Sequence, residues 1–71
     1  MVTLLKMNII VNGELRQVPD GHTAAQLVEA MGLGGRIAME VNLEIVPRSA
    51  YADYTFQDGD RVEIVHAVGG G

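Results

Sequence analysis

The dipeptide Asn12-Gly13 is the feature that most constrains how this chain of 71 residues can fold. A two-residue type I′ turn needs positive φ at both central positions, and Asn followed by Gly meets that need at little conformational cost. The residues before it, Met7 to Val11, are rich in β-branched side chains, and Glu14 to Val18 follow it. The chain therefore opens with a predicted β-hairpin, which the turn residues Pro19-Asp20-Gly21 close.

A single helix is predicted after the hairpin. Thr23 and Gln26 have the spacing of a capping box, in which each side chain bonds a free backbone N–H of the other. Apolar residues recur from there at helical spacing, at Ala24, Leu27, Val28 and Met31. Gly32 is the expected C-terminal stop, because glycine accepts the left-handed conformation.

Three more strands are predicted, at Ile37 to Val41, Glu44 to Val46 and Arg61 to Val65, with a helical turn between Arg48 and Tyr54. The element order is then β-β-α-β-β-β, which indicates an α+β fold. A hairpin, a crossing helix and a return strand form a mixed sheet with one face covered by the helix. This is the β-grasp arrangement, in which the first and last strands lie side by side and the chain end projects beyond the sheet.

Composition excludes several classes of protein. There are no cysteines, so disulfides, thiolate metal sites and thiol catalysis are all excluded. The formal charge is −4 with five Lys+Arg, which disfavours nucleic-acid binding. No apolar run approaches the roughly 20 residues of a membrane span. The first six residues are too short for a signal peptide, so a cytoplasmic protein is expected.

The sequence ends in Gly69-Gly70-Gly71. Taken alone, these glycines fit a frayed terminus as well as a functional end. Glycine has no Cβ and can enter a narrow channel, and the five residues from Ala67 can span about 17 Å at about 3.3–3.6 Å each. A carboxylate on such an arm could enter another enzyme's active site.

Four segments together resemble one known family. They are Asn8 to Gly13, the block Asn42 to Arg48 with its Val-Pro-Arg end, the run Gln57 to Val65 with its Asp-Gly-Asp, and the terminal glycines. In this order and at this length they are similar to the thiamine-pathway sulfur carriers, the ThiS family. The resemblance covers Met7 to Gly71, so residues 1–6 are expected to be an N-terminal extension, 7–66 the β-grasp domain and 67–71 a reactive tail.

The resemblance implies a ubiquitin-like fold and a carrier that is not itself an enzyme. The Gly71 carboxylate would be adenylated by a ubiquitin-activating-like enzyme of the ThiF type, which uses ATP. A sulfur donor protein would then convert it to a thiocarboxylate, which would deliver sulfur to a thiazole synthase of the ThiG type. Gly70 would accompany Gly71 in the enzyme's channel, and Gly69 would add reach. The carrier itself would bind no cofactor.

Two related functions stay open from the sequence. One is the sulfur carrier of molybdopterin synthase, which also ends in Gly-Gly. The other is a ubiquitin-like protein modifier or interaction module, which would form amide bonds to lysines with the same tail. A small enzyme is disfavoured, because no nucleophile–base pair is visible and the isolated His22 and His66 do not make a metal site.

A docking surface is predicted on the open face of the sheet. If Met7, Ile9 and Val11 face the helix, Ile10 lies on the opposite face, and Val65 on the neighbouring strand joins it. An exposed apolar patch of this kind often marks a protein-binding surface, whereas two scattered apolar residues would not.

Overall fold

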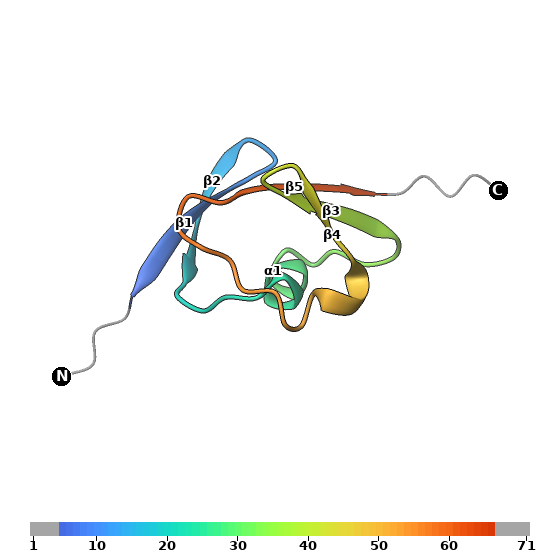
Figure 1. Ribbon diagram of the computed structural model, residues 1–71, viewed down its shortest axis with the longest axis horizontal. Coiled ribbons are helices and arrows are strands. Elements are labelled where there is room, and N and C mark those ends of the chain that lie inside the picture. The colour runs from blue at the N-terminus through green and yellow to red at the C-terminus, as the bar shows by residue number, and fades with distance from the viewer. Residues whose placement is uncertain (1–4, 67–71) are drawn as a thin grey trace.

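We describe residues 5–66 of a computed structural model of the chain (Figure 1). These residues form five strands, one α-helix and one short 3-10 helix. Their bounds are β1 Lys6–Val11, β2 Glu14–Pro19, α1 Ala24–Ala30, β3 Ile37–Val41, β4 Glu44–Val46, η1 Arg48–Ala50 and β5 Arg61–His66. The predicted order of elements is confirmed, and each predicted strand lies within one residue of its observed bounds.

The five strands form one mixed sheet in the order β2-β1-β5-β3-β4. Strand β1 runs antiparallel to β2 and parallel to β5, and β3 runs antiparallel to both β5 and β4. The helix α1 lies across one face of this sheet (Figure 1). The β-grasp prediction is therefore confirmed, including the placement of the first strand beside the last.

The first hairpin has the turn that its sequence predicts. Asn12 and Gly13 have φ angles of 50° and 82°, as a type I′ turn requires. This turn fixes the register, so that Val11 lies opposite Glu14, Ile10 opposite Leu15 and Ile9 opposite Arg16. The side chains of Met7, Ile9 and Val11 consequently point to one face of β1, and all three are buried.

The helix is short and begins at a complete capping box. The Thr23 hydroxyl accepts from the Gln26 backbone N–H at 3.2 Å, and the Gln26 side chain accepts from the Thr23 N–H at 2.9 Å. The helix ends at Ala30, and Gly32 adopts the left-handed conformation with φ of 67°. Of the predicted apolar stripe, Ala24 and Leu27 are buried, whereas Val28 and Met31 are half-buried at the edge of the core.

One core lies between the helix and the inner face of the sheet. Its largest fully buried side chains come from the three central strands and the helix: Ile9, Leu27, Met39 and Val62. The opposite face of the sheet carries no element among residues 5–66 and is exposed. A chain this small buries only about 60% of its unfolded surface, so the loss of a single core side chain removes a large part of its stability.

Replacing Leu27 by Ala should lower the free energy of unfolding by about 2–5 kcal/mol, because the Leu27 side chain has no exposed surface and its removal leaves a cavity. Urea denaturation followed by circular dichroism measures the change. Glu29→Ala, at an exposed position of the same helix, is the control and should change stability by less than about 0.5 kcal/mol. A loss below about 1 kcal/mol for Leu27→Ala would mean that the helix packs through another face.

Candidate functional site

Strand β5 leads directly to the glycine end of the chain and lies in the middle of the sheet. Its first residues pair with β1, where Arg61 lies opposite Ile10 and Val62 opposite Val11. On its other side it pairs with β3 from Val62 to His66. The root of the predicted tail is therefore fixed to the body of the domain up to His66.

The side chain of Asn12 extends the contact between β1 and β5 beyond the end of β1. Its carboxamide oxygen accepts from the Ile64 backbone N–H at 2.8 Å, and its nitrogen donates to the Ile64 carbonyl at 3.1 Å. The carboxamide thus replaces the next peptide unit of the parallel ladder. This arrangement holds β5 in place two residues before its end.

Asn42 bonds β5 from the other side, where β3 ends. Its backbone N–H donates to the Arg61 carbonyl at 2.8 Å, and its side-chain oxygen accepts from the Arg61 N–H at 3.0 Å. Its side-chain nitrogen donates to Asp60 at 3.0 Å. Both hairpin turns within residues 5–66 therefore place an asparagine against β5.

The two acidic residues before β5 have structural partners. Asp58 accepts from the Asn8 backbone N–H at 2.7 Å, and Asp60 accepts from the Gln57 N–H at 2.9 Å in addition to Asn42. These bonds shape the turn at Gly59, whose φ is 87°. The geometry supports a turn at this Asp-Gly-Asp sequence and gives no indication of an acid–base pair.

The predicted docking residues Ile10 and Val65 lie on the open face of the sheet, but they are not neighbours. Ile10 is half-buried and lies opposite Arg61, whereas Val65 is 56% exposed and lies opposite Ala38. Since Arg61, Glu63 and Val65 alternate along one face of β5, two charged side chains separate Ile10 from Val65. The two residues therefore belong to opposite ends of this face.

Two exposed apolar residues that the sequence analysis missed lie on the same face. Leu15 is 73% exposed and directly opposite Ile10, and Ile45 is 76% exposed and lies on the far side of β3 from β5, opposite Glu40. The Asn-Gly turn could have identified Leu15, because a two-residue loop sets the pairing of Ile10 with Leu15. The placement of Ile45 beyond Glu40 and Glu63 depends on the order of strands, which no local pattern sets.

Neither histidine has the surroundings of a catalytic or metal-binding group. His22 is half-buried, its Nε2 has no hydrogen-bond partner, and burial together with nearby Arg16 lowers its pKa. His66 is exposed at the end of β5, opposite Ile37. Within residues 5–66 no three His, Asp or Glu side chains are grouped as metal ligands, and no helix in that range is long and apolar enough to cross a membrane.

The three residues predicted to carry the chemistry, Gly69, Gly70 and Gly71, lie outside the described residues. The sequence matches the model of the ThiS family over residues 9–71, which includes all three glycines. The chain belongs to the ThiS family. The resemblance noted from the sequence motifs is confirmed.

The proteins similar to this chain fall into two groups. The sulfur carrier protein ThiS of Escherichia coli is 32% identical over 66 residues, which are 92% of this chain and the whole of that protein. Thiazole synthases of Paramagnetospirillum magneticum and Magnetococcus marinus are 44% and 35% identical over 66 residues. This chain spans about a fifth of the length of those two synthases, since the match covers 20% of each.

A solved ThiS structure has the same fold. The crystal structure of the thiamine biosynthesis protein ThiS from Geobacter metallireducens superimposes with a TM-score of 0.80 and 32% identity, and the match covers 92% of this chain and 100% of that one. A solution structure of a thiamine biosynthesis protein from the same organism gives a TM-score of 0.74.

The Asn12 side chain should be required for the attachment of β5. Asn12→Asp keeps the size of the side chain and tolerates the positive φ, but it places an oxygen against the Ile64 carbonyl in place of a donor. We expect a loss of about 1–3 kcal/mol in the free energy of unfolding and faster hydrogen exchange at the Ile64 amide.

Gln17→Glu provides the matched control, because it makes the same charge change on exposed β2 at a side chain that takes part in none of the hydrogen bonds described above. Both variants are compared at pH 7 by denaturation and exchange. Equal effects in the two variants would show that the loss of stability comes from the added negative charge and not from the lost bonds between Asn12 and β5.

Proposed function

We propose that this chain is a sulfur carrier of thiamine biosynthesis, in which the terminal carboxylate of Gly71 carries the sulfur. The observation that carries the proposal is the family match, which runs through the β-grasp domain and continues to Gly71. It favours the thiamine pathway over the molybdopterin carrier and over a protein modifier. The domain's part in this chemistry is to present the end of the chain, and it needs no catalytic side chain of its own.

The proposed reaction takes place at Gly71 in a partner's active site. A carboxylate oxygen of Gly71 attacks the α-phosphate of ATP, which releases pyrophosphate and leaves an acyl adenylate. A hydrosulfide ion released by the sulfur donor protein then attacks the carbonyl carbon and displaces AMP. The product is a thiocarboxylate, whose sulfur can be passed to an acceptor.

Three protein partners follow from this reaction. An adenylating enzyme of the ThiF type would supply the ATP site, a sulfur donor protein would supply the nucleophile, and a thiazole synthase of the ThiG type would accept the sulfur. The third partner has support in the relatives named thiazole synthase, in which a region similar to this chain is part of the same protein. We place these reactions in the cytoplasm.

Adding one residue after Gly71 should abolish thiocarboxylate formation. A carboxylate oxygen of the terminal residue must come within about 3–3.5 Å of the α-phosphorus of ATP, and a displaced end cannot reach that geometry. The assay incubates the protein with ATP, a sulfur source and the adenylating enzyme, and detects the gain of about 16 mass units that accompanies exchange of oxygen for sulfur.

Thermal stability should be nearly unchanged in the extended variant, because the buried core described here lies between Met7 and Ile64. A variant with one residue added before Met1 is the control and should gain sulfur normally. An extended protein that still gained the sulfur would mean that the carried group is not at Gly71, and a large loss of stability would mean that the glycines belong to the core.

We further propose that the open face of the sheet, through Ile10 and Val65 with Leu15 and Ile45, contacts the adenylating enzyme. Leu15, Ile45 and Val65 have 56–76% of their surface exposed, on the face opposite the helix. Apolar side chains so exposed on a small protein are typical of an interaction surface. The intervening Arg61, Glu63 and Glu40 would supply polar contacts between two apolar ends.

Val65→Asp should weaken binding to the adenylating enzyme at least about tenfold without unfolding the domain, because it places a charge in a desolvated contact. Ile10→Asp should weaken it similarly, with a greater loss of stability because Ile10 is half-buried. Titration calorimetry with the purified enzyme measures the affinity, and Ala52→Asp, on an exposed loop, is the control. Unchanged affinity in folded Val65→Asp would remove Val65 from the interface.

A further inference from the structure

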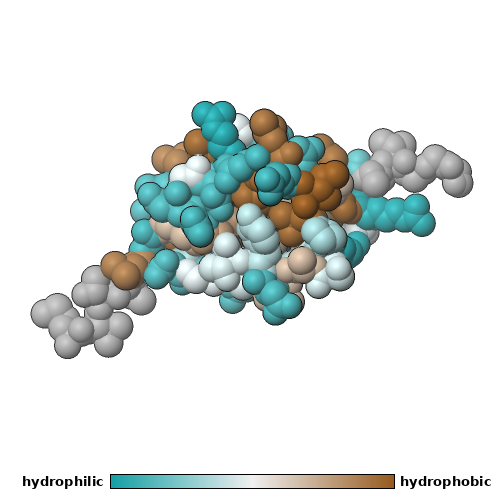
Figure 2. All heavy atoms as spheres, viewed as in Figure 1, coloured by the Kyte–Doolittle hydropathy of each residue, from teal (hydrophilic) through white to brown (hydrophobic). Residues whose placement is uncertain are grey.

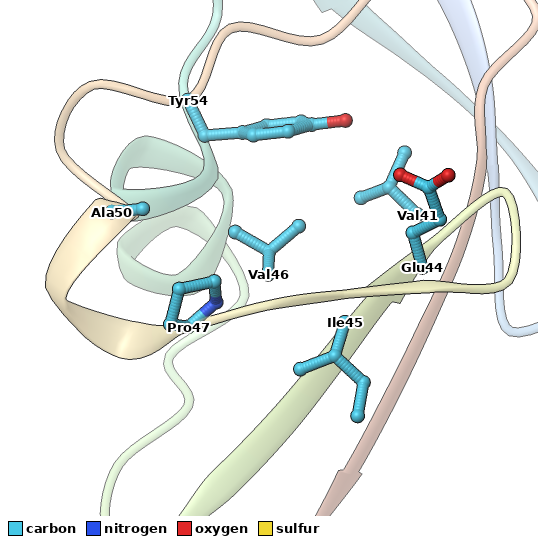
Figure 3. Close-up of a pocket in the computed structure, with 7 residues that line it drawn as sticks. All are labelled: Val41, Glu44, Ile45, Val46, Pro47, Ala50 and Tyr54. Carbon is cyan, nitrogen blue, oxygen red and sulfur yellow. The ribbon is translucent and has the colours of Figure 1, made fainter.

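A hollow of about 110 Å³ lies at the edge of the sheet beside β4, on the side that faces the helix. Figure 3 shows the side chains of Val46, Pro47 and Ala50 on one side of it, with Val41 and Glu44 on the other, and the ring of Tyr54 across the top. The side chain of Ile45 points away from these residues, toward the open face (Figure 3). Ile45 also lines the hollow, so the hollow borders the surface proposed above to contact the adenylating enzyme.

The side chains around the hollow are mostly hydrocarbon, with the Glu44 carboxylate and the Tyr54 hydroxyl as polar groups. Val41, Val46, Pro47 and Ala50 have hydrocarbon side chains, and apolar side chains gather on this side of the molecule around β4 (Figure 2). The Glu44 side chain is exposed, and none of the side-chain hydrogen bonds within residues 5–66 uses its carboxylate. Glu44 is thus free to pair with a cation.

The hydroxyl end of Tyr54 lies in the same acidic environment. Its pKa is raised first by burial and then by the negative charges of Asp60 and Glu44. The Asp60 carboxylate already accepts hydrogen bonds from the Gln57 backbone N–H and the Asn42 side chain. Glu44 is therefore the carboxylate available to a ligand. The aromatic ring of Tyr54 adds a surface that attracts cations.

The size of the hollow limits what can enter it. Sites for cofactors and drug-sized ligands have volumes of roughly 300–1,000 Å³, well above this one. A cavity of about 150 Å³ holds a benzene molecule, so this hollow suits a single unbranched side chain. Lysine and arginine combine such an apolar stem with a cationic head, and both commonly place the stem on apolar surface with the head in water.

The free edge of β4 can hydrogen-bond to a partner segment that carries such a side chain. β4 is the last strand of the sheet, and Val41 and Glu44 flank the two-residue turn as a hydrogen-bonded pair. Because hydrogen-bonded and non-bonded pairs alternate, the N–H and C=O of Ile45 point toward the free edge. An extended segment of another protein can bond to such an edge and present alternate side chains beside it.

We propose that this hollow binds the side chain of a lysine or arginine from an extended segment of a partner protein. The stem of that side chain lies on Val46, Pro47 and Ala50, and its cationic head pairs with Glu44 beside the Tyr54 ring. The chain's net charge of −4 also favours the approach of a basic partner. The proposal is independent of the sulfur-carrier function, since it uses neither the open face nor Gly71.

The test titrates the full-length, 15N-labelled protein with a blocked tripeptide, valine–lysine–valine, and follows the amide shifts by NMR. A second peptide replaces lysine by norleucine, which keeps the stem and lacks the ammonium group. We expect saturable shifts at the amides of Glu44 to Tyr54, with the lysine peptide bound about two- to fivefold more tightly, as is typical of an exposed ion pair. This advantage should shrink as the salt concentration rises.

Two variants separate the parts of the site. Glu44→Gln should remove the advantage of the lysine peptide, and Ala50→Leu should fill the hollow and weaken both peptides at least about tenfold. Glu63→Gln makes the same charge change on β5 and should bind both peptides as the wild type does. Because Glu44 is exposed, its variant provides the test even if Ala50→Leu does not fold.

Three results would overturn the proposal: no saturable shifts at millimolar peptide, shifts centred on the open face instead of β4, or an unchanged preference for lysine in Glu44→Gln. Either of the first two results would show that the hollow is not a binding site, and the third would show that it does not select a cationic side chain. None of them bears on whether Gly71 carries sulfur, so the two proposals can fail separately.

Discussion

The attachment of β5 to the strand on either side of it is the interaction on which the rest of this structure depends. Toward β1 the parallel ladder contains only two residue pairs, Ile10 with Arg61 and Val11 with Val62. It is completed by backbone bonds from Ile10 to Asp60 at 2.9 Å and from Asn12 to Val62 at 2.8 Å. The Asn12 carboxamide adds two more bonds to Ile64, so a side chain supplies part of a short ladder.

This short ladder joins two parts of the chain that are distant in sequence. The hairpins β1–β2 and β3–β4 each form around a two-residue turn, whereas Asn12 and Ile64 are 52 residues apart. Closing so long a loop is entropically unfavourable, and the closure becomes stable only when Ile9 and Val62 are buried under Leu27 of the helix. The helix therefore stabilises the pairing of the central strands as well as covering them.

The sequence was sufficient to predict what is local. The Asn12-Gly13 turn, the Thr23–Gln26 capping box and the facing of Met7, Ile9 and Val11 toward the helix are all found in the structure. Each depends on residues a few positions apart, where sterics and hydrogen bonding decide the conformation without help from the rest of the chain.

The candidate docking face could be predicted only in part, because its layout depends on contacts between distant strands. Sequence alternation correctly assigned Ile10 and Val65 to the open face. It could not give the register of β1 against β5, which no turn fixes, and that register separates the two residues by Arg61 and Glu63. Likewise, the preference of type I′ turns for asparagine explains the residue type at position 12, but not its bonds to Ile64.

The β3–β4 turn shows that nonlocal bonds can also override a local preference. Its central residues Asn42 and Leu43 have φ angles of 52° and 70°, a region that leucine enters at a cost of about 1–2 kcal/mol. Leu43 is 88% exposed, so burial of its side chain does not offset that strain. Asn42 makes three hydrogen bonds to Arg61 and Asp60, each of which contributes about 0.5–1.5 kcal/mol, enough together to hold the turn. The conformation of Leu43 thus follows from the docking of its neighbour against β5, as the position of Ile64 follows from Asn12 on the other side.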